Sequence, residues 1–372
     1  MRIAQVAPLA ESVPPKTYGG TERIVSYLTD ALVDLGHDVT LYASGDSITR
    51  ATLKACHPCA LRANAEQPGP DIPHQRMMRR VLNDADAYDV IHFHVGWFEF
   101  PLFAPLTHKC LTTLHGRLDV PSAQERLSRF PSFPLVSISD AQRLPLPHLA
   151  WQGTIYHGIP QELMPEPAPE RNYVVFLGRI SPEKRPDLAI DIARRAGIPI
   201  KIAAKVDRVD QEYHEAMIRP LLDLPGVEFL GEVGEHDKMT LLAGAKALLF
   251  PIDWPEPFGL VMIEAMACGT PVIAFRRGSV PELITDGVTG FIVETASEAV
   301  EAVNQVDRLD AHRIRDIFRQ RFTAERMAHD HVHQYQALLA GGVVAEGAAG
   351  LVRSRLRTPK QITALYSREE KG

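Results

Sequence analysis

Several signals that would place a chain in a common class are missing from this sequence. No apolar run approaches the roughly 20 residues that a membrane-spanning helix requires. Residues 1–8 read as a strand and lack the long apolar core of a signal peptide. We therefore expect a cytoplasmic protein, with weak peripheral contact at the inner membrane face as the open alternative.

Signature motifs of several enzyme classes are also absent. The chain contains no G-x-G-x-x-G, no P-loop and no G-x-S-x-G, which disfavours dehydrogenases, P-loop NTPases and α/β-hydrolases. Positive charge is in deficit, with 40 Lys and Arg against 46 Asp and Glu and a net charge of -6. A chain of this charge is not expected to take nucleic acid as its main partner.

Cysteine is scarce, and its pattern does not indicate a metal or redox centre. Of four cysteines, Cys56 and Cys59 form one C-x-x-C. A thioredoxin-like role needs such a pair at a helix start, and structural zinc needs a second ligand pair. We interpret them as ordinary loop or strand cysteines and leave open whether they pair. His329, His331 and His333 have no further ligand near them, so we expect a solvated helix face and no metal.

What the sequence does contain is a regular alternation of strand and helix signals, which is typical of α/β domains with parallel sheets. Strands are expected at residues 2–7, 38–43, near 52, and at 89–94, 110–115, 134–138, 151–156, 173–177, 199–204, 227–230, 246–251, 271–275 and 289–293. Helices are expected at 21–35, 76–86, 183–196, 210–219, 235–243, 258–268, 295–306, 310–320 and 323–340.

The length of 372 residues is too great for one ordinary core, so two domains are expected. We place a first Rossmann-like domain at 1–160, a proline-rich linker at 161–171 and a second Rossmann-like domain at 172–322. A C-terminal helix at 323–340 precedes a weakly ordered basic tail at 341–372. Ligands of such sheets bind outside the carboxyl ends of the strands, so we expect a site in the cleft between the two halves.

The stretch 255–274 carries the most chemical information. Two prolines precede an apolar helix that Gly269 and Pro271 end, with Glu256 just before the helix and Glu264 about two turns into it. A helix N-terminus favours a phosphate, and a carboxylate beside it is useful when it accepts hydrogen bonds from hydroxyls of the same ligand. A nucleotide sugar has this form. The alternative is one acid that caps the helix and another on its polar face.

A second polar turn follows the strand at 173–177. Arg179 and Lys184 lie on either side of Glu183, at the start of the crossover to the next helix. Two cations there suit the diphosphate leaving group of a nucleotide sugar. The alternative is an Arg179–Glu183 ion pair and a solvated Lys184.

The first half offers two candidate contacts to the same ligand. Gly19 and Gly20 lie between the first strand and the first helix, where adjacent glycines let the backbone approach a ligand; the alternative is a loop in which Thr21 only caps the helix. His115 follows the strand at 110–114 and can contact a sugar hydroxyl or take part in proton transfer.

Other polar residues near strand ends have simpler interpretations. His92 and His94 lie on one strand and are interpreted as structural. Ser139 and Gln142 fit a capping box that opens a short helix.

In combination these motifs resemble the family 4 glycosyltransferases (glycosyl transferases group 1), whose GT-B fold has two Rossmann-like parallel-sheet domains facing across a cleft. The resemblance extends over about residues 1–340, and its most specific element is the E-x7-E motif, matched by Glu256 and Glu264. Supporting matches are Gly19-Gly20, Thr113-Leu114-His115-Gly116, Phe176-Leu177-Gly178-Arg179 with Glu183-Lys184, and Ser279-Val280-Pro281-Glu282 before Asp286-Gly287-Val288-Thr289-Gly290.

The resemblance implies roles for the residues of the helix start. Glu264 would bind the ribose hydroxyls of the donor. Glu256 would hold the hydroxyls of the donor sugar, with Phe258, Gly259 and Leu260 also binding the donor.

The resemblance also implies roles for the other matched residues. Arg179 and Lys184 would neutralise the leaving diphosphate, His115 would contact the donor sugar, and Gly19 and Gly20 would lie near the diphosphate and the acceptor. The catalytic residues it implies are Glu256, His115, Arg179 and Lys184.

An enzyme of this family would move a hexosyl group from a nucleotide-diphosphate sugar to a hydroxyl of a glycan, glycolipid or small molecule. The resemblance implies retention of the anomeric configuration, with the leaving phosphate as base and without a metal or other cofactor. It also implies that the helix at 323–340 crosses back onto the first domain. One departure is Arg277-Gly278-Ser279, where many members have two glycines, so contacts to the donor can differ there.

Two other functions stay open: a sugar-nucleotide epimerase or hydrolase on the same fold, and a non-catalytic nucleotide-sugar-binding subunit. The sequence identifies neither the donor sugar and its base nor the acceptor or the oligomeric state. The tail carries Arg353, Arg355, Arg357 and Lys360, which could contact an anionic membrane surface.

Overall fold

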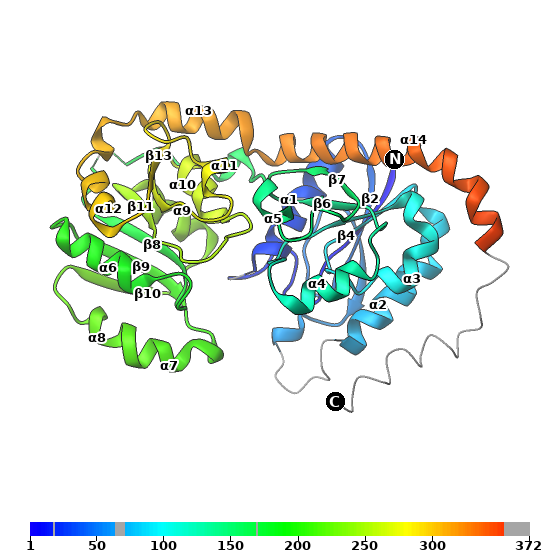
Figure 1. The fold of residues 1–372 in the computed structure, drawn as a ribbon, viewed down its shortest axis with the longest axis horizontal. Coiled ribbons are helices and arrows are strands. Elements are labelled where there is room, and N and C mark those ends of the chain that lie inside the picture. Colours follow the sequence, from blue (N-terminus) through cyan, green and yellow to red (C-terminus); the bar gives the residue numbers. More distant parts are fainter. Residues whose placement is uncertain (18, 64–70, 169, 353–372) are drawn as a thin grey trace.

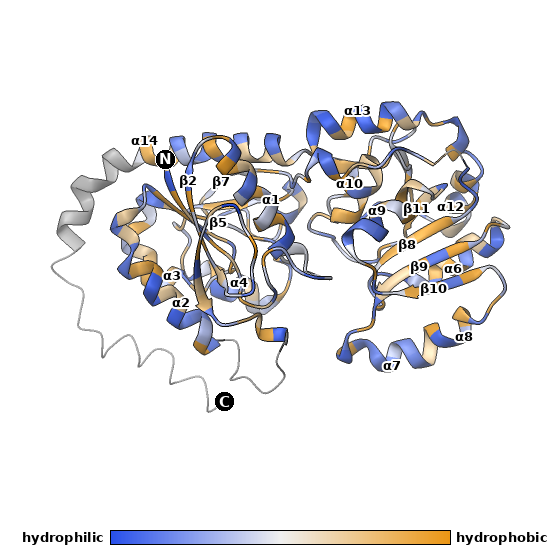
Figure 2. Ribbon diagram, turned by 180° about the vertical axis from the view of Figure 1, so that it is seen from behind, coloured by the Kyte–Doolittle hydropathy of each residue, from blue (hydrophilic) through white to orange (hydrophobic). Residues whose placement is uncertain are grey.

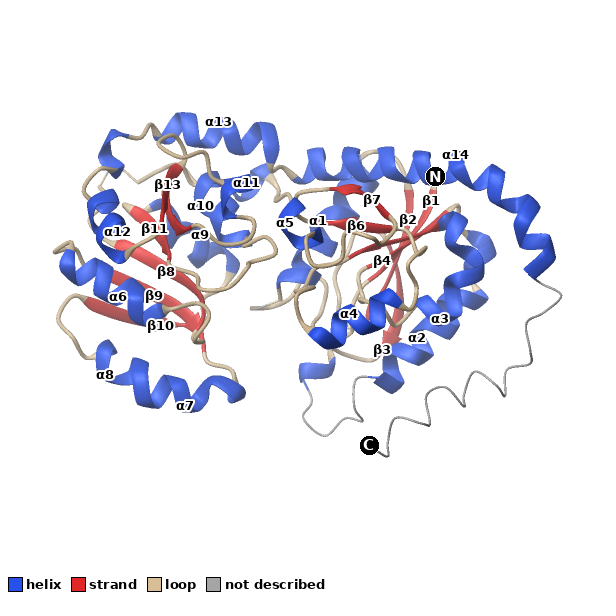
Figure 3. Ribbon diagram, in the orientation of Figure 1, coloured by secondary structure: helices blue, strands red, loops and turns tan. Residues whose placement is uncertain are grey.

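The computed structural model describes residues 1–17, 19–63, 71–168 and 170–352. Within them two parallel sheets follow one another along the chain, each flanked by helices (Figures 1 and 3). The first has the strand order β3-β2-β1-β4-β5-β6-β7 and the second the order β10-β9-β8-β11-β12-β13. The predicted α/β class with two parallel-sheet domains is therefore confirmed, while the residue limits 1–160 and 172–322 stay a prediction.

The first sheet is built from short strands, which are mostly buried except for the edge strands β3 and β7. Its strands are β1 (Arg2–Val6), β2 (Asp38–Ser44), β3 (Thr52–His57), β4 (Val90–Phe93), β5 (Cys110–Thr113), β6 (Leu135–Ser137) and β7 (Trp151–Thr154). The helices around it are α1 (Gly20–Asp34), α2 (Asp71–Asn83), α3 (Phe100–Phe103), α4 (Pro121–Ser128) and α5 (Asp140–Arg143).

The second sheet repeats this arrangement. Its strands are β8 (Val174–Arg179), β9 (Ile200–Lys205), β10 (Val227–Gly231), β11 (Ala247–Phe250), β12 (Val272–Phe275) and β13 (Gly290–Val293). The helices are α6 (Pro186–Arg195), α7 (Gln211–Tyr213), α8 (Arg219–Leu222), α9 (Glu235–Ala243), α10 (Leu260–Ala267), α11 (Val280–Leu283), α12 (Ala296–Val303) and α13 (Ala311–Arg321), and α14 (Ala324–Val352) follows them.

The strand order reverses once in each sheet, between β1 and β4 and between β8 and β11. At such a point the connections leave in opposite directions, and a crevice opens at the carboxyl ends of the strands. The first crevice receives the segment from β1 to the start of α1, which contains Gly19 and Gly20. The second receives the segments after β8 and β11, which contain Lys184 and Glu256. The fold thus gathers residues that lie far apart in the sequence.

Helix α14 joins the two halves. It follows α13 of the second half and then lies along the first sheet (Figure 1). There Met327, Ala328 and Tyr335 share one core with Ile3 and Leu111. In Figure 2, β8 is coloured mainly as hydrophobic, whereas α13 has both hydrophobic and hydrophilic residues. Helix α14 follows the second half in the chain but packs on the first sheet. Burial of its apolar face therefore helps to hold the two halves together.

The helix expected at 210–219 is confirmed as a helical segment, but this segment is not a regular α-helix. Residues 208–222 form a 3-10 turn, the single turn α7, a π-helical segment His214–Ile218 and the short α8. Pro220 lies in the first turn of α8. Its ring lacks an N–H and clashes with the carbonyl one turn earlier, so a regular α-helix cannot run through this point and the turn before it widens.

The boundaries of two other helices also differ from expectation. The helix predicted from residue 76 begins at Asp71, because Pro73 is tolerated in a first turn where its missing N–H would have no partner. The tail predicted from 341 begins as a continuation of α14 to Val352, and 353–372 lie outside the described residues. In the part of the chain that the structure describes, no helix is long and apolar enough to cross a membrane.

Candidate functional site

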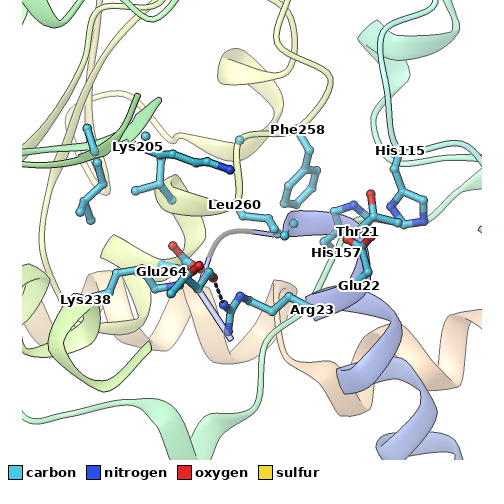
Figure 4. Close-up of a pocket in the computed structure, with 18 of the residues that line it drawn as sticks. Thr21, Glu22, Arg23, His115, His157, Lys205, Lys238, Phe258, Leu260 and Glu264 are labelled. Carbon is cyan, nitrogen blue, oxygen red and sulfur yellow. Dashed lines mark hydrogen bonds and ion pairs between the residues drawn. The ribbon is translucent and has the colours of Figure 1, made fainter. Parts of the chain in front are cut away.

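A cavity of about 580 Å³ lies between the two halves of the molecule. It is lined by the Gly19–Gly20 loop, the start of α1 and His115 from the first half, and by the end of β9 and residues of the loops after β8, β10 and β11 from the second half. Figure 4 shows His115, His157 and Arg23 facing Lys205, Lys238 and Glu264 across this space. The cavity is thus formed where the two strand-order reversals meet.

The cavity brings together all but one of the residues that the sequence marked out. Those that line it are Gly19, Gly20, His115, Lys184, Glu256, Phe258, Gly259, Leu260 and Glu264. Arg179 is not among the lining residues. Its guanidinium instead donates to Glu183 at 2.5 Å and approaches Asp207 at 3.5 Å. The role predicted for Arg179 at the diphosphate therefore stays a prediction.

The start of α10 depends on a glycine in the left-handed region. Gly259 is the N-cap, with φ of 81°, and a Cβ there would lie 2.8 Å from Met262 Cε. Glycine adopts this conformation without strain but supplies no capping side chain, so the first amide groups of α10 have no side-chain acceptor at the cap. The alternative in which Glu256 caps the helix is wrong.

The neighbouring loop supports the same segment. Gly278 has φ of 53°, and a Cβ there would lie 2.3 Å from the carbonyl oxygen of Glu256. The backbone N–H of Ser279 donates to that carbonyl at 3.0 Å, and Ser279 Oγ donates to the carbonyl of Phe258 at 2.7 Å. Arg277, in the Arg277-Gly278-Ser279 loop that departs from the family pattern, is partly exposed. The glycine that touches Glu256 is therefore present, and the departure lies beside it.

Glu256 is held by two donors on one carboxylate oxygen. Lys184 Nζ lies 2.5 Å from Oε2, and Trp254 Nε1–H donates to Oε2 at 2.8 Å. The Glu256 side chain is only 11% exposed, and the Lys184 side chain 15%. The predicted alternative of a solvated Lys184 is therefore wrong, because its ammonium is paired with the carboxylate of Glu256, on the loop after the neighbouring strand β11.

Glu264 has a lysine of its own. Lys238 Nζ, from α9, lies 2.6 Å from Glu264 Oε1 and 3.3 Å from Glu235. Tyr27 of α1 donates to Glu235 at 2.9 Å, and Arg23 of α1 is ion-paired with the same carboxylate. A chain of charges therefore runs from the first half across the cleft to Glu264.

His115 stands at the end of a row of buried imidazoles. Its Nε2 lies 2.9 Å from Nδ1 of His94, whose Nε2 lies 2.8 Å from Gln5 Oε1. His115 also stacks on His157, with ring centroids 5.1 Å apart. Burial lowers the pKa of His115 to about 3, so the ring is neutral near pH 7 and can exchange hydrogen bonds with a hydroxyl without carrying charge.

Other predicted features of the first half are partly corrected. Thr21 does not cap α1, whose N-cap is Gly19 without a side-chain bond. Ser139 Oγ does accept from the N–H of Gln142 at 3.1 Å, but Gln142 Oε1 accepts from the N–H of Ile138 at 2.9 Å instead of that of Ser139. Gln142 Nε2 donates to the carbonyls of Leu114 and Gly116 at 2.9 Å. That amide fixes the loop that carries His115.

The histidines of α14 are not all solvated, as the sequence suggested. His333 is exposed, and His329 is about half-exposed, whereas His331 is buried with its ring centroid 4.8 Å from that of His92. Among the described residues, no three His, Cys, Asp or Glu side chains are grouped to hold a metal ion. Cys56 and Cys59 are both free thiols.

Several lining residues escaped the sequence reasoning. Lys205 ends β9 and His157 follows β7, so the rule that sites lie at strand ends could have found both. Arg23 and Lys238 lie within helices, and nothing in their sequence context marks them. Only the packing of α1 and α9 against the cleft brings these two cations to it.

Two family models match the chain. The model described as Glycosyltransferase Family 4 matches residues 18–147, and the model described as Glycosyl transferases group 1 matches residues 162–323. These ranges contain most of the first and second sheets, respectively.

A curated relative matches over a shorter stretch. The D-inositol 3-phosphate glycosyltransferase of Mycobacterium tuberculosis is 34% identical over 148 residues, which is 38% of this chain and 30% of the relative. The chain therefore spans less than a third of the length of that relative.

Solved structures match over nearly the whole chain. A glycosyltransferase involved in avilamycin A biosynthesis has a TM-score of 0.70 and 27% identity, covering 92% of this chain and 98% of its own. The Anabaena protein HepE, solved with UDP and glucose, has a TM-score of 0.68 and 20% identity, covering 91% and 100%. Sucrose-phosphate synthase from Thermosynechococcus elongatus gives 0.70 and 20%, covering 92% and 100%. The last two likenesses establish the fold alone.

Proposed function

Because the chain belongs to the glycosyltransferases of group 1 and family 4 with the GT-B fold, we propose that it moves a hexosyl group from a nucleotide-diphosphate sugar to an acceptor hydroxyl. The observation that carries the proposal is the pair of lysine-bound carboxylates, Glu256 and Glu264, in the cavity between the two halves. In a ligand with hydroxyls on both sides of a diphosphate, the hydroxyls would donate to the carboxylates and the diphosphate would bind the lysines.

The two carboxylates act in this proposal as hydrogen-bond acceptors. Each is bound to an ammonium at 2.5 or 2.6 Å, and each carboxyl group has further lone pairs that can accept from hydroxyls. Glu264, beside Lys238 and deep in the second half, takes the ribose hydroxyls. Glu256 takes the hydroxyls of the donor sugar, opposite the neutral ring of His115.

The charge of the diphosphate is met by protein cations. Lys184 and Lys205 line the cavity. At the start of α10, next to Gly259, the first backbone N–H groups have no side-chain cap and can donate to a phosphate. On donor binding, Lys184 would share its ammonium between Glu256 and the diphosphate, and would stabilise the charge that develops as the bond to the sugar breaks. These cations support departure of the diphosphate without a metal ion.

We further propose that the anomeric configuration is retained. Glu256 and Glu264 are each ion-paired with a lysine. This pairing favours a role as hydrogen-bond acceptor for hydroxyls over a role as nucleophile. The acceptor hydroxyl would then attack from the face that the diphosphate leaves, with the leaving phosphate oxygen taking its proton. The Gly19–Gly20 loop offers backbone beside this position.

The donor is tested first by binding. UDP-, GDP- and ADP-sugars are added singly, and a donor present at about 100 times its Kd should stabilise the folded chain by about 2.7 kcal/mol, seen as a rise in Tm. Stabilisation by none of them, together with no transfer to a panel of acceptors, would overturn the proposal. Turnover without an acceptor would indicate the epimerase or hydrolase alternative, and binding without turnover the non-catalytic one.

The residues are tested by separate substitution. Lys184→Gln and Glu256→Gln should each lower kcat by about 100-fold or more, because each removes a contact to a group whose charge or geometry changes in the transition state. Lys246→Gln is the matched control, since Lys246 pairs with Asp307 at 2.8 Å away from the cavity lining. Full activity of either site variant, with a Tm close to that of the wild type, would contradict the assigned roles.

A further inference from the structure

Trp254 lies two residues before Glu256, on the loop after β11. Its Nε1–H donates to Glu256 Oε2 at 2.8 Å. Trp254 is not among the residues that line the cavity, although its ring packs against the core of the second half. The lining residue to which its indole is hydrogen-bonded is Glu256.

The hydrogen bonds of Glu256 are unevenly divided between its two oxygens. Trp254 and Lys184 both donate to the same oxygen, Oε2. A carboxylate held at one oxygen from two directions cannot rotate freely. Oε1 is thereby kept as the oxygen that accepts from a ligand, and the indole N–H supplies one of the two constraints.

The face of the Trp254 ring carries a cation from the other half of the molecule. The guanidinium carbon of Arg117 lies 4.6 Å from the ring centroid, a cation–π distance. Arg117 follows His115 by two residues and is fixed by two hydrogen bonds to Asp119, at 2.8 and 2.6 Å. The contact therefore forms only when the loop of His115 and the loop of Glu256 are brought together.

The same ring also lies under Lys184, whose Nζ is 5.0 Å from the centroid. Lys184 is thus attracted both to the carboxylate of Glu256 and to the ring that orients this carboxylate. Two groups of the proposed donor site, Glu256 and Lys184, and Arg117 from the first half thus meet at one side chain that is not part of the cavity lining.

We infer that Trp254 is a positioning residue for sugar transfer: its N–H orients the Glu256 carboxylate, and its ring couples that orientation to closure of the cleft through Arg117. The inference rests on the proposed role of Glu256 in holding the donor sugar. It assigns the indole two separable functions, one through the N–H and one through the ring face.

Substitutions can separate the two functions. Trp254→Phe keeps an aromatic face for Arg117 and removes the N–H, and should lower kcat about ten- to a hundred-fold while the KM for the donor changes less than about threefold. Arg117→Gln keeps the N–H and removes the cation, and should raise the KM for the donor because closure is less favoured. Trp151→Phe is the matched control, since the Trp151 N–H donates to the Leu146 carbonyl at 2.9 Å outside the cavity lining.

A conservative variant distinguishes orientation from packing. In Trp254→His the imidazole superposes on the pyrrole part of the indole and places Nε2 where Nε1 lies, so kcat should recover at least about threefold over Trp254→Phe. In an enzyme that already carries Glu256→Gln, Trp254→Phe should lower kcat much less, because the carboxylate that the indole N–H orients is no longer present.

The outcomes keep this inference apart from the proposed function. A wild-type chain that neither binds nor turns over any nucleotide sugar refutes the proposed function. A wild-type chain that is active, with Trp254→Phe within twofold of it, refutes the inference alone. If circular dichroism shows that Trp254→Phe is poorly folded, the two other variants test the inference. Wild-type kinetics in Arg117→Gln would refute the coupling of the Trp254 ring to cleft closure. A kcat of Trp254→His that is no higher than that of Trp254→Phe would refute the role of the indole N–H.

Discussion

Glu99 is a buried carboxylic acid that the proposed site does not use. Its Oε1 accepts a hydrogen bond from Thr112 Oγ1 at 2.7 Å, and its Oε2 has no partner among the described residues. Burial raises the pKa of Glu99 to about 8. The folded protein therefore holds this group protonated at pH 7, and ionisation of Glu99 works against the fold.

This residue predicts a loss of stability at alkaline pH. Between about pH 4.5 and pH 8 the folded state binds the Glu99 proton more tightly than the unfolded state, so the contribution of Glu99 to the unfolding free energy falls as pH rises through this range. Glu99→Gln should remove that loss and raise the unfolding free energy at pH 9 by about 3–5 kcal/mol, the equivalent of the pKa shift. Denaturant unfolding of both proteins at pH 5 and pH 9 measures it.

The exposed Glu125 supplies the control for that measurement. Its side chain is 68% exposed, so Glu125→Gln should change stability equally little at both pH values. An alkaline gain in Glu125→Gln as large as that in Glu99→Gln, or none in the latter, would contradict the explanation by burial.

Single residues also mark how far the sequence could predict the site. Glu256, Lys184 and His115 all follow strands, and parallel strands present their carboxyl ends at one edge, so their convergence could be predicted. Arg179 obeys the same rule, yet its guanidinium is held elsewhere by carboxylates of the loops after β8 and β9, which are Glu183, Asp207 and Asp210. The position of Lys238 depends on how α9 packs on α10, which no local pattern reveals.

Among the elements, α14 is the one whose packing reaches farthest from its place in the chain. The Tyr335 hydroxyl accepts from Gln5 Nε2 at 3.1 Å and lies 2.7 Å from Nδ1 of His92, both on the first sheet. Tyr335 is fully buried. One hydroxyl thus satisfies two polar groups of the sheet interior, and the row of histidines that ends at His115 is anchored on this helix.

Removal of that hydroxyl should destabilise the fold. Tyr335→Phe leaves Gln5 and His92 without their shared partner in a dry interior, and should lower the unfolding free energy by about 1–3 kcal/mol. Thermal and denaturant unfolding measure the loss. Tyr213→Phe is the comparison, because the Tyr213 hydroxyl bonds Asp187 in a partly exposed position and should cost less. Equal losses in the two variants would indicate that burial of Tyr335 is not the cause.

The prediction of elements from sequence succeeded where a strand or helix is determined locally. The strand predicted at 89–94 appears as β4 and the helix at 235–243 as α9, because each has an uninterrupted pattern and clear ends. The segment 208–222 is helical as predicted, but the sequence reasoning did not foresee that Pro220 would interrupt the α-helical hydrogen bonds of the turn before it. Helix α1 begins at Gly20 without a side-chain cap, and the capping signal of Thr21 was misleading.

In the whole molecule, the ion pairs of Glu235 connect the two halves across the cavity. Arg23 and Tyr27 reach it from α1, and Lys238 binds it from its own helix. No pattern in the sequence indicates this connection, because it depends on the distance and orientation of two separately folded sheets. The alternation of strands and helices predicted the two units but not the groups by which they meet.

Loss of this connection should favour an open cleft. Glu235→Gln keeps the size of the side chain but weakens its bonds to Arg23 and Tyr27, and should shift the ratio of open to closed molecules by about ten- to a hundred-fold. Small-angle scattering would register a larger radius of gyration. The exposed pair of Arg195 and Asp191 gives the control, Asp191→Gln, which should leave the scattering curve unchanged. Identical curves for Glu235→Gln and the wild type would mean that other contacts hold the cleft closed.

The two positions before Ser279 differ in what they tolerate, and this has a use in engineering. Position 278 has no room for any side chain, because the backbone of Glu256 occupies the space that a Cβ would need. Position 277 carries an arginine that points to Asp253 and Glu294 at 3.7 Å. A library intended to alter donor preference should therefore randomise 277 and keep 278 constant. Variation at 277 changes the charge next to the Glu256 loop, whereas variation at 278 would yield mostly molecules in which that loop is displaced.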